Sequence, residues 1–276
     1  MKVLLLGASS YLGARLFFEL QNEVDIVGTY SSHNMSAKLI PLDITLKDDV
    51  SSLIKSVKPD VIIHTANNAN PIWCEQHPEE AVRVNQSSMK HIITAAKDVN
   101  SRLVYISSFS AEDNTTVYGR TKHFSEEALK QSGLGYLIIR PSLILGMSPN
   151  TTSDRSFNRM VKQLQNNTTV EYDIEWKFQP TYIKHVADVI RDSIRRGIYG
   201  YTIPVAVKDI KSRFEVCTDI FTPFDISVVP IHSSDHGIIL TDDLEILTKL
   251  SLPEYTYEDM ITNIISEIKQ KETFVL

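Results

Sequence analysis

Short apolar runs and amphipathic stretches alternate along the first half of the chain. The apolar runs have the length and composition of buried strands; they are Val3–Leu6, Asp25–Tyr30, Leu39–Leu42, Val61–Thr65, Leu103–Ser107 and Tyr136–Arg140. The stretches between them carry apolar residues at helical spacing; they are Ser10–Leu20, Asp48–Val57, Glu79–Val99 and Thr121–Gln131. Strands that alternate with helices in this way predict an α/β fold with a doubly wound parallel sheet.

A glycine-rich segment, Gly7–Gly13, lies between the first predicted strand and the first predicted helix. In a Rossmann-type fold this turn meets the pyrophosphate of a dinucleotide at a helix N-terminus. Gly7 permits a tight turn and Gly13 lets helix and strand approach closely, while Ser10 stands where a third glycine is expected. The segment therefore predicts a dinucleotide site, and a turn without a ligand is the alternative.

The pattern changes after Gly146. A polar stretch, Pro149–Ser156, precedes a predicted helix at Phe157–Leu164, and a helix at Val186–Arg196 precedes a last strand at Gly200–Val207. We expect a dinucleotide-binding Rossmann domain in residues 1–150, to which residues 180–207 return. Residues 151–179 and 208–276 are expected to form a smaller α/β lobe that binds the substrate.

Composition and charge narrow the classes of protein. The chain of 276 residues is 42% hydrophobic and 22% charged, as in ordinary globular proteins. Its net charge of −6 gives no support to a nucleic-acid or anionic-membrane partner. No stretch approaches the ~20 apolar residues of a membrane span, and the N-terminal residues lack the features of a signal peptide. We therefore expect a cytoplasmic protein.

Metal ligands and disulfides are not expected either. Cys74 and Cys217 are too few for a disulfide framework or a zinc site. His64 falls on a predicted buried strand, and His232 and His236 fall in an expected loop without a known ligand spacing. The sequence therefore predicts no metal.

Tyr118 is the only tyrosine of the chain with a lysine, Lys122, four positions later. Residues at this spacing share one face of a helix. A nearby cation favours the phenolate, so we expect Lys122 to lower the Tyr118 pKa toward working pH. A hydroxyl that serves as both acid and base suits the interconversion of carbonyl and alcohol. The pair follows the serines Ser107 and Ser108 by ten residues, which strengthens this interpretation.

Taken together, these features resemble the extended short-chain dehydrogenase/reductase superfamily. Within it the chain is similar to dTDP-4-dehydrorhamnose reductases and related sugar-nucleotide-binding proteins. The resemblance runs over nearly the whole chain; its segments are Gly7–Gly13, Asp43–Ile44, His64–Asn67, Ser107–Ser108, Tyr118–Lys122, Arg140–Gly146, Pro180–Ile183 and Val186–Asp188.

The resemblance implies three catalytic residues. Ser108 would hydrogen-bond the substrate oxygen, Tyr118 would act as the acid, and Lys122 would hold the nicotinamide ribose. Cofactor contacts are implied along the ends of the successive strands; the expected residues are Gly7, Ser9, Ser10, Tyr11, Leu12, Gly13, Tyr30, Ser31, Ser32, Asp43, Ile44, Thr65, Ala66, Asn67, Ser107, Tyr118, Lys122, Pro141 and Ser142.

Substrate contacts are expected from another set, namely Asn68, Trp73, Ser108, Arg155 and Thr181. Trp73 could stack on a sugar or base, with core packing as the alternative. Arg155 could clamp a pyrophosphate, with a solvated helix face shared with Arg159 as the alternative. Thr181 could instead anchor the returning chain. Asn85 is either a structural asparagine of the resembled family or a buried capping amide.

Two departures from the family pattern affect the interpretation. Only nine residues separate Ser108 from Tyr118, fewer than in most sugar-nucleotide relatives, which predicts a different substrate or a more open substrate site. Ser108 is followed by Phe109–Ser110 and not by the Asp–Glu pair that dehydratases need, which disfavours dehydration.

The leading hypothesis is a reductase that transfers hydride to the C4 carbonyl of a keto-deoxysugar nucleotide. The segment Gly28–His33 contains no acid to hold the ribose hydroxyls, so NADP is preferred over NAD. A sugar-nucleotide 4-epimerase that uses NAD, or a non-catalytic dinucleotide-binding regulatory subunit, are the alternatives. Homodimers are common in the resembled family, so a homodimer is considered as well.

Overall fold

The computed structural model describes the whole chain except residues 167–168, 234–239, 242 and 275. Within these described residues the central sheet has seven parallel strands in the order β11-β6-β5-β4-β1-β2-β3. Their bounds are β1 Lys2–Leu6, β2 Asp25–Tyr30, β3 Leu39–Pro41, β4 Val61–His64, β5 Arg102–Ile106, β6 Tyr136–Pro141 and β11 Tyr201–Val205. The order reverses at β1, which confirms the Rossmann-type doubly wound sheet predicted from the sequence.

The central strands are apolar on both faces because helices cover both. Leu4 of β1 pairs in register with Val27 and with Ile62, and is fully buried. Alternate residues of β1 contribute to two separate apolar clusters, with Leu4 in one and Leu5 in the other. This is the reason that the strands read as continuous apolar runs in the sequence.

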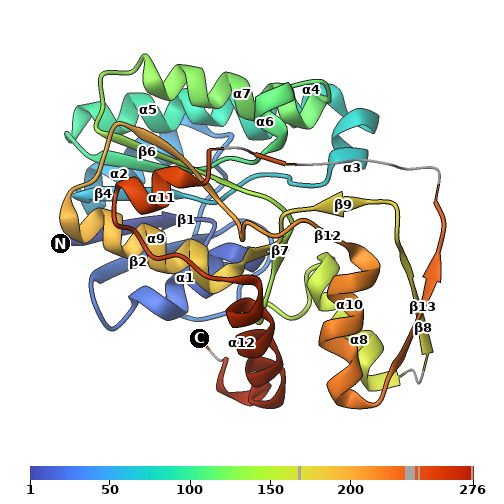
Figure 1. Ribbon diagram of the computed structural model, residues 1–276. Coiled ribbons are helices and arrows are strands. Elements are labelled where there is room, and N and C mark those ends of the chain that lie inside the picture. The colour runs from blue at the N-terminus through green and yellow to red at the C-terminus, as the bar shows by residue number, and fades with distance from the viewer. Residues whose placement is uncertain (167–168, 234–239, 242, 275) are drawn as a thin grey trace.

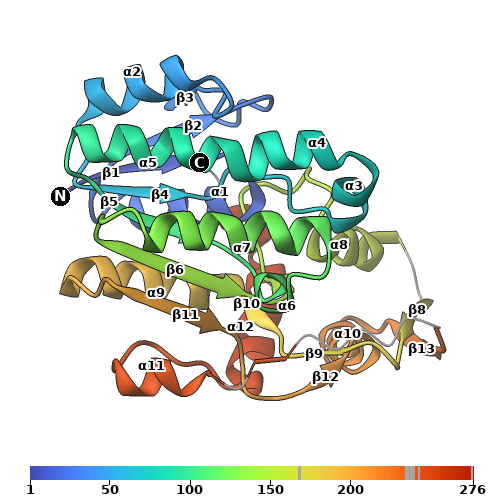
Figure 2. The same ribbon diagram turned by 90° about the horizontal axis from the view of Figure 1, so that it is seen from above.

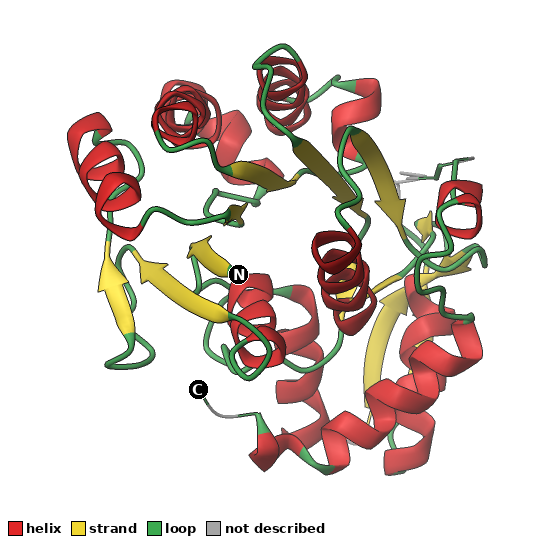
Figure 3. Ribbon diagram, turned by 90° about the vertical axis from the view of Figure 1, so that its left-hand side faces the viewer, coloured by secondary structure: helices red, strands yellow, loops and turns green. Residues whose placement is uncertain are grey.

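Figure 1 shows α2, α5 and α7 on one face of the sheet and α1 and α9 on the other, and Figures 2 and 3 show the same layers from above and from the side of the N-terminus. The bounds are α1 Tyr11–Leu20, α2 Lys47–Val57, α5 Ser88–Asp98, α7 Val117–Lys130 and α9 Ile183–Arg196. Shorter helices lie between them, α3 Pro71–Gln76, α4 Pro78–Ala81 and α6 Ser110–Asp113. A π-helical segment, Val82–Ser87, joins α4 to α5 where the sequence predicted one uninterrupted helix.

A smaller group of elements lies beside the main sheet (Figure 1). Its two-stranded sheets pair β8 with β13 in parallel, β9 with β12 antiparallel, and β7 with β10 in parallel. The bounds are β7 Ile144–Leu145, α8 Ser156–Asn166, β8 Thr169–Asp173, β9 Lys177–Phe178, β10 Thr181–Tyr182, β12 Lys211–Ser212, α10 Arg213–Phe221 and β13 Ser227–Ile231. The boundaries proposed for a substrate lobe stay a prediction, and His236 lies outside the described residues.

The chain ends in two further helices, α11 Glu245–Lys249 and α12 Tyr257–Lys269. Single 3₁₀ turns occur at Thr222–Phe224 and Lys271–Thr273. A capping box at Thr256 fixes the start of α12, with Asp259 as the reciprocal partner. None of the helices in the described part of the chain combines the length and apolarity needed to cross a bilayer.

Candidate functional site

The glycine-rich loop follows β1 and leads into α1. Gly7 has a φ of +84°, which glycine adopts without strain, and a Cβ there would lie 2.8 Å from the Cα of Ala66. A Cβ at Gly13 would lie 2.1 Å from the carbonyl oxygen of Gly7. The close approach and the tight turn predicted for these two glycines are therefore both present.

Ser10 caps α1 at the position where a third glycine was expected. Its Oγ accepts a hydrogen bond from the backbone N–H of Gly13 at 3.0 Å and donates one to Oγ1 of Thr65 at 3.3 Å. Thr65 in turn lies 2.8 Å from the carbonyl oxygen of Leu6 and is buried. The Ser10 hydroxyl thus supports the turn, and the N-terminal N–H groups of α1 remain the donors that suit a phosphate.

The ends of β2 and β3 lie at the same edge of the sheet, because Tyr30 pairs in register with Pro41. Tyr30 is half-buried, and Ser31 and Ser32 are exposed beyond it. Asp43 is also exposed, and its Oδ1 accepts hydrogen bonds from the backbone N–H and hydroxyl of Thr45 at 2.9 and 2.7 Å. Ile44 is buried in the core. These residues are placed where an adenosine could reach them, and their roles stay a prediction.

The three predicted catalytic residues lie together at the carboxyl end of β5. Tyr118 is in the first turn of α7, whose N-cap, Thr116, accepts a hydrogen bond from the N–H of Gly119 at 3.0 Å. The Ser108 side chain lies near enough to Tyr118 to act on its pKa. Lys122 lies one turn further along α7, with its Nζ 5.7 Å from the centroid of the Tyr118 ring. The shared helix face predicted for Tyr118 and Lys122 is confirmed.

Burial decides the protonation of this cluster. It raises the pKa of Tyr118 to about 12, although the Ser108 side chain and the charge of Arg155 act in the other direction. The prediction that Lys122 lowers the Tyr118 pKa toward neutrality is wrong in this structure, because desolvation outweighs nearby charge. Burial lowers the pKa of Lys122 itself to about 7, and its Nζ donates a hydrogen bond to the carbonyl oxygen of Ile106 at 2.8 Å. At neutral pH Tyr118 is therefore a phenol that can give a proton.

A buried ion pair that the sequence reasoning missed supports this cluster. Glu126, one turn after Lys122 on α7, is fully buried and accepts hydrogen bonds from Nε and Nη2 of Arg140 at 2.9 and 2.7 Å. It also accepts one from the hydroxyl of Ser107 at 2.5 Å. The Ser107 hydroxyl, expected near the cofactor, is therefore used inside the protein. Spacing along a helix does not indicate this contact, because Glu126 lies on α7 and Arg140 on β6.

Asn85 lies in the π-helical segment and binds the backbone of Asn68, which follows β4. Its side-chain Oδ1 accepts a hydrogen bond from the N–H of Asn68 at 2.8 Å, and its Nδ2 donates to the carbonyl oxygen of Asn68 at 2.9 Å. Cys74 and Tyr118 belong to one small apolar cluster against which Trp73 packs. The structure thus gives Asn85 a structural role, and it places Trp73 against the cluster that contains Tyr118.

The two arginines of the polar stretch differ in their surroundings. Nη1 of Arg155 donates a hydrogen bond to the carbonyl oxygen of Ala69 at 3.0 Å, and its charge is felt by Tyr118. Arg159 is exposed and pairs with Asp154 at 2.5 Å. Arg155 is therefore the arginine at the site, and Arg159 has the solvated role considered as the alternative.

Thr181 does not line the site with its side chain. It is fully buried, its hydroxyl donates to the carbonyl oxygen of Val205 at 2.6 Å, and it accepts from the N–H of Ser142 at 2.9 Å. The expected substrate contact is therefore replaced by the alternative, an anchor for the returning chain. The Ser142 hydroxyl is a buried polar atom without a partner among the described residues, and Pro141 beside it accepts from the N–H of Phe109 at 3.2 Å.

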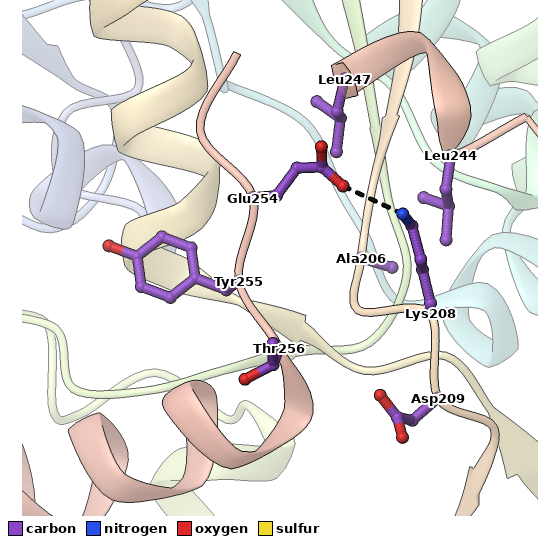
Figure 4. A pocket seen from close by; sticks show the side chains of 8 residues that line it. All are labelled: Ala206, Lys208, Asp209, Leu244, Leu247, Glu254, Tyr255 and Thr256. Atoms are coloured by element: carbon purple, nitrogen blue, oxygen red, sulfur yellow. Dashed lines mark ion pairs between the residues drawn. The ribbon is translucent and has the colours of Figure 1, made fainter. Parts of the chain in front are cut away.

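A pocket of about 210 Å³ lies beside this site, at the end of β11 (Figure 4). It is lined by Ala206, Lys208, Asp209, Leu244, Leu247, Glu254, Tyr255 and Thr256. Lys208 and Glu254 pair across it at 3.2 Å. Ala206 and Leu244 form an apolar cluster with Phe109, the residue after Ser108, so two lining residues of the pocket contact the segment that follows Ser108. None of the predicted catalytic residues lines it.

The fold and this arrangement define a Rossmann-type α/β protein with a Ser–Tyr–Lys cluster. Residues 1–238 match the family model described as the RmlD substrate binding domain. The chain belongs to this family, which confirms the resemblance found in the sequence.

Among characterised proteins, the chain is 26% identical over 205 residues to methionine adenosyltransferase 2 subunit beta of Bos taurus. That match covers 69% of this chain and 61% of the relative, so the chain spans less than two thirds of that protein. It is 25% identical over 209 residues to dTDP-4-dehydrorhamnose reductase of Salmonella typhimurium, covering 71% of this chain and 67% of that protein.

Solved structures agree in the fold. The dTDP-4-dehydrorhamnose reductase of Bacillus anthracis, determined in complex with NADP, superposes with a TM-score of 0.82. The match covers 96% of this chain and 99% of that one at 21% sequence identity.

Proposed function

We propose that the chain is an NAD(P)H-dependent reductase of a keto-deoxysugar nucleotide, acting on the C4 carbonyl. The observation that carries the proposal is the cluster of Ser108, Tyr118 and Lys122 at the carboxyl end of β5. In a doubly wound sheet ligands bind at this edge, near the point where the strand order reverses. Membership of the RmlD family and the likeness to named dTDP-4-dehydrorhamnose reductases support the substrate class.

The residues present fit a dinucleotide. Gly7 and Gly13 leave a backbone turn that no Cβ could enter, and the N-terminus of α1 follows it directly. The unpartnered hydroxyl of Ser142 lies beyond β6, where the nicotinamide end is expected. We propose that the residues expected from the sequence at the ends of the successive strands contact the cofactor. The lack of an acid in Gly28–His33 supports NADP over NAD. The solved neighbours support binding of either dinucleotide, since one contains NADP and another contains NAD.

When bound, the reduced nicotinamide would supply the hydride, and this chain's residues would handle the proton. Tyr118 stays protonated at neutral pH, because burial raises its pKa to about 12, so it can donate to the oxygen of a carbonyl. Ser108, whose side chain lies near enough to Tyr118 to act on its pKa, would hold that oxygen in line. Lys122 would bind the ribose hydroxyls from the same helix face.

The substrate would lie between Trp73 and Arg155. The indole stacks on the ring of His77 at a centroid distance of 4.8 Å and is partly exposed. The guanidinium of Arg155, fixed by the carbonyl oxygen of Ala69, would pair with the pyrophosphate of a nucleotide sugar. Asn68 would add an amide between them.

A second candidate is a non-catalytic dinucleotide-binding subunit on the same fold. The similarity to methionine adenosyltransferase 2 subunit beta favours it, since that relative is named as a subunit of another enzyme. The short segment between Ser108 and Tyr118 points the same way. The intact Ser108–Tyr118–Lys122 set favours catalysis, because a subunit without chemistry does not need it.

The deciding experiment measures oxidation of NADPH and of NADH with a panel of 4-keto-6-deoxysugar nucleotides. We expect turnover with at least one sugar, and a loss of about 10²–10⁴-fold in kcat for Tyr118→Phe. Tyr201→Phe is the matched control, because Tyr201 is exposed at the start of β11. Tight cofactor binding without turnover on any sugar would reject the reductase and favour the subunit.

A further inference from the structure

Residues 146–150, called the strap below, lie on the glycine-rich loop and the first turn of α1. The hydroxyl of Tyr11 donates a hydrogen bond to the carbonyl oxygen of Gly146. The hydroxyl of Ser148 donates to the carbonyl oxygen of Tyr11 at 2.6 Å, and Nδ2 of Asn150 donates to that of Ser9 at 2.7 Å. The strap is thus joined to two of the backbone positions expected to meet a dinucleotide.

The strap is held on its other side by a buried ion pair. Arg15 of α1 donates from Nη1 to the carbonyl oxygen of Met147 at 2.6 Å, and the N–H of Met147 donates to Oε2 of Glu267 at 2.9 Å. Arg15 and Glu267 also bind each other, with Nη2 2.6 Å from Oε1. The three groups form a closed triangle in which both backbone groups of Met147 are bound.

Glu267 comes from α12, beyond the residues 1–238 that match the family model. Its Oε1 also accepts a hydrogen bond from the hydroxyl of Tyr182 at 2.6 Å. The side chains of Arg15 and Glu267 are 2% and 11% exposed, so little water replaces either partner if the other is removed. Arg15 has a second partner in Glu19, whose Oε1 lies 2.7 Å from its Nε. Loss of the Glu267 charge would therefore leave the buried Arg15 with one carboxylate in place of two, which is unfavourable and favours a local rearrangement.

We propose that Glu267 is a positioning residue that sets the dinucleotide affinity of the chain by holding the strap on the glycine-rich loop. The inference rests on the proposed function, because it assumes that the loop binds a dinucleotide. When Glu267 no longer binds Met147, the strap is free to leave Ser9 and Tyr11. The cofactor then has to order the glycine-rich loop when it binds, and the free energy needed for this weakens its affinity.

The test compares Glu267→Gln and Glu267→Asp with the wild-type chain. Gln has the same shape without the charge, and Asp keeps the charge but is too short to reach both Arg15 and Met147. Glu258→Gln is the matched control, since Glu258 lies exposed on the same helix. Two quantities are measured: amide hydrogen exchange of peptides covering residues 143–155 without any cofactor, and the Kd of NADPH and NADH by fluorescence titration.

We expect faster exchange in the strap and a Kd raised at least about fivefold in the Glu267 variants, with neither change in Glu258→Gln. Should Glu267→Gln fail to fold, Glu267→Asp carries the test, because it leaves Arg15 paired. Wild-type exchange in the strap of Glu267→Asp, or a wild-type Kd, would overturn the role of Glu267. Absence of NADPH and NADH binding by the wild-type chain would instead overturn the proposed function on which it rests.

Discussion

Glu126 binds Arg140 through both branches of the guanidinium, with Nε and Nη2 2.9 and 2.7 Å from its two oxygens, and is itself fully buried. The pair joins α7 to β6, and the Ser107 hydroxyl adds β5 to the same carboxylate. The serine of the candidate site follows β5 by two residues, and the tyrosine and the lysine lie on α7. Their mutual geometry therefore depends on a carboxylate that touches none of the reacting groups.

Glu126→Gln should destabilise the chain by about 3–5 kcal/mol, because it leaves the Arg140 charge without its buried partner. Urea unfolding followed by circular dichroism measures this loss. Glu127→Gln is the matched control, since Glu127 is the next residue and 42% exposed, and a change within about 0.5 kcal/mol is expected there. Equal effects for the two variants would contradict the role given to Glu126.

The buried His64 should make the fold sensitive to acid. Burial lowers its pKa to about 3, with the charge of Lys122 acting in the same direction. The unfolded histidine takes up a proton near pH 6.5, whereas the folded one does so only near pH 3. Between these two pH values the folded state therefore binds fewer protons than the unfolded state. The free energy of unfolding therefore falls as pH falls, by about 1.4 kcal/mol per pH unit for one group.

His64→Leu removes one group that takes up a proton on unfolding. The slope of the unfolding free energy against pH should therefore fall by about 1.4 kcal/mol per pH unit between pH 6 and pH 4. Urea unfolding at a series of pH values measures it, with the exposed His33→Gln as control. Some slope should survive, because burial also lowers the pKa of His185 to about 4. A slope unchanged by His64→Leu would mean that His64 is protonated in the folded state.

Gly13→Ala should damage both the fold and the cofactor site. The added Cβ would lie 2.1 Å from the carbonyl oxygen of Gly7, so α1 must move away from β1. We expect a loss of about 1–3 kcal/mol in stability or more, together with weaker binding of NADPH. Gly135→Ala is the control, since a Cβ there meets only the side chain of Arg102, at 3.3 Å. Thermal unfolding and cofactor titration of both variants decide the matter.

The parallel sheet and its order of elements could be predicted from the sequence because the central strands β1, β4, β5 and β6 are buried on both faces and read as apolar runs. Boundaries were less accurate where local signals compete. The helix expected at Thr121–Gln131 begins at Val117, because Thr116 acts as its N-cap. The π-helical segment around Asn85 has no signal in apolar spacing, since it depends on how Asn85 reaches Asn68.

Sequence motifs predicted the position of the candidate site, but they did not predict the pKa values of its residues. A helix position indicates which residues share a face, and it contains no measure of burial. Burial raises the Tyr118 pKa to about 12 where proximity to Lys122 had predicted a decrease. The contacts of Glu267 with Arg15 and Met147 join three distant parts of the chain. A local sequence pattern cannot predict contacts of this kind.

Arg155→Met tests the part of the site that would bind substrate and not cofactor. Arg155 is fixed at 3.0 Å from the carbonyl oxygen of Ala69 and lies near enough to Tyr118 to affect its pKa. Because a hydrogen bond to a charged group contributes about 1.5–3 kcal/mol, KM for the nucleotide sugar should rise roughly 10–100-fold, while the Kd of NADPH stays close to that of the wild type. Arg159→Met is the matched control and should leave both constants unchanged, since Arg159 pairs with Asp154 in solvent. If the two variants raise KM equally, the pyrophosphate is bound by the general positive charge around the start of α8. If only the NADPH Kd rises in Arg155→Met, the guanidinium belongs to the cofactor site.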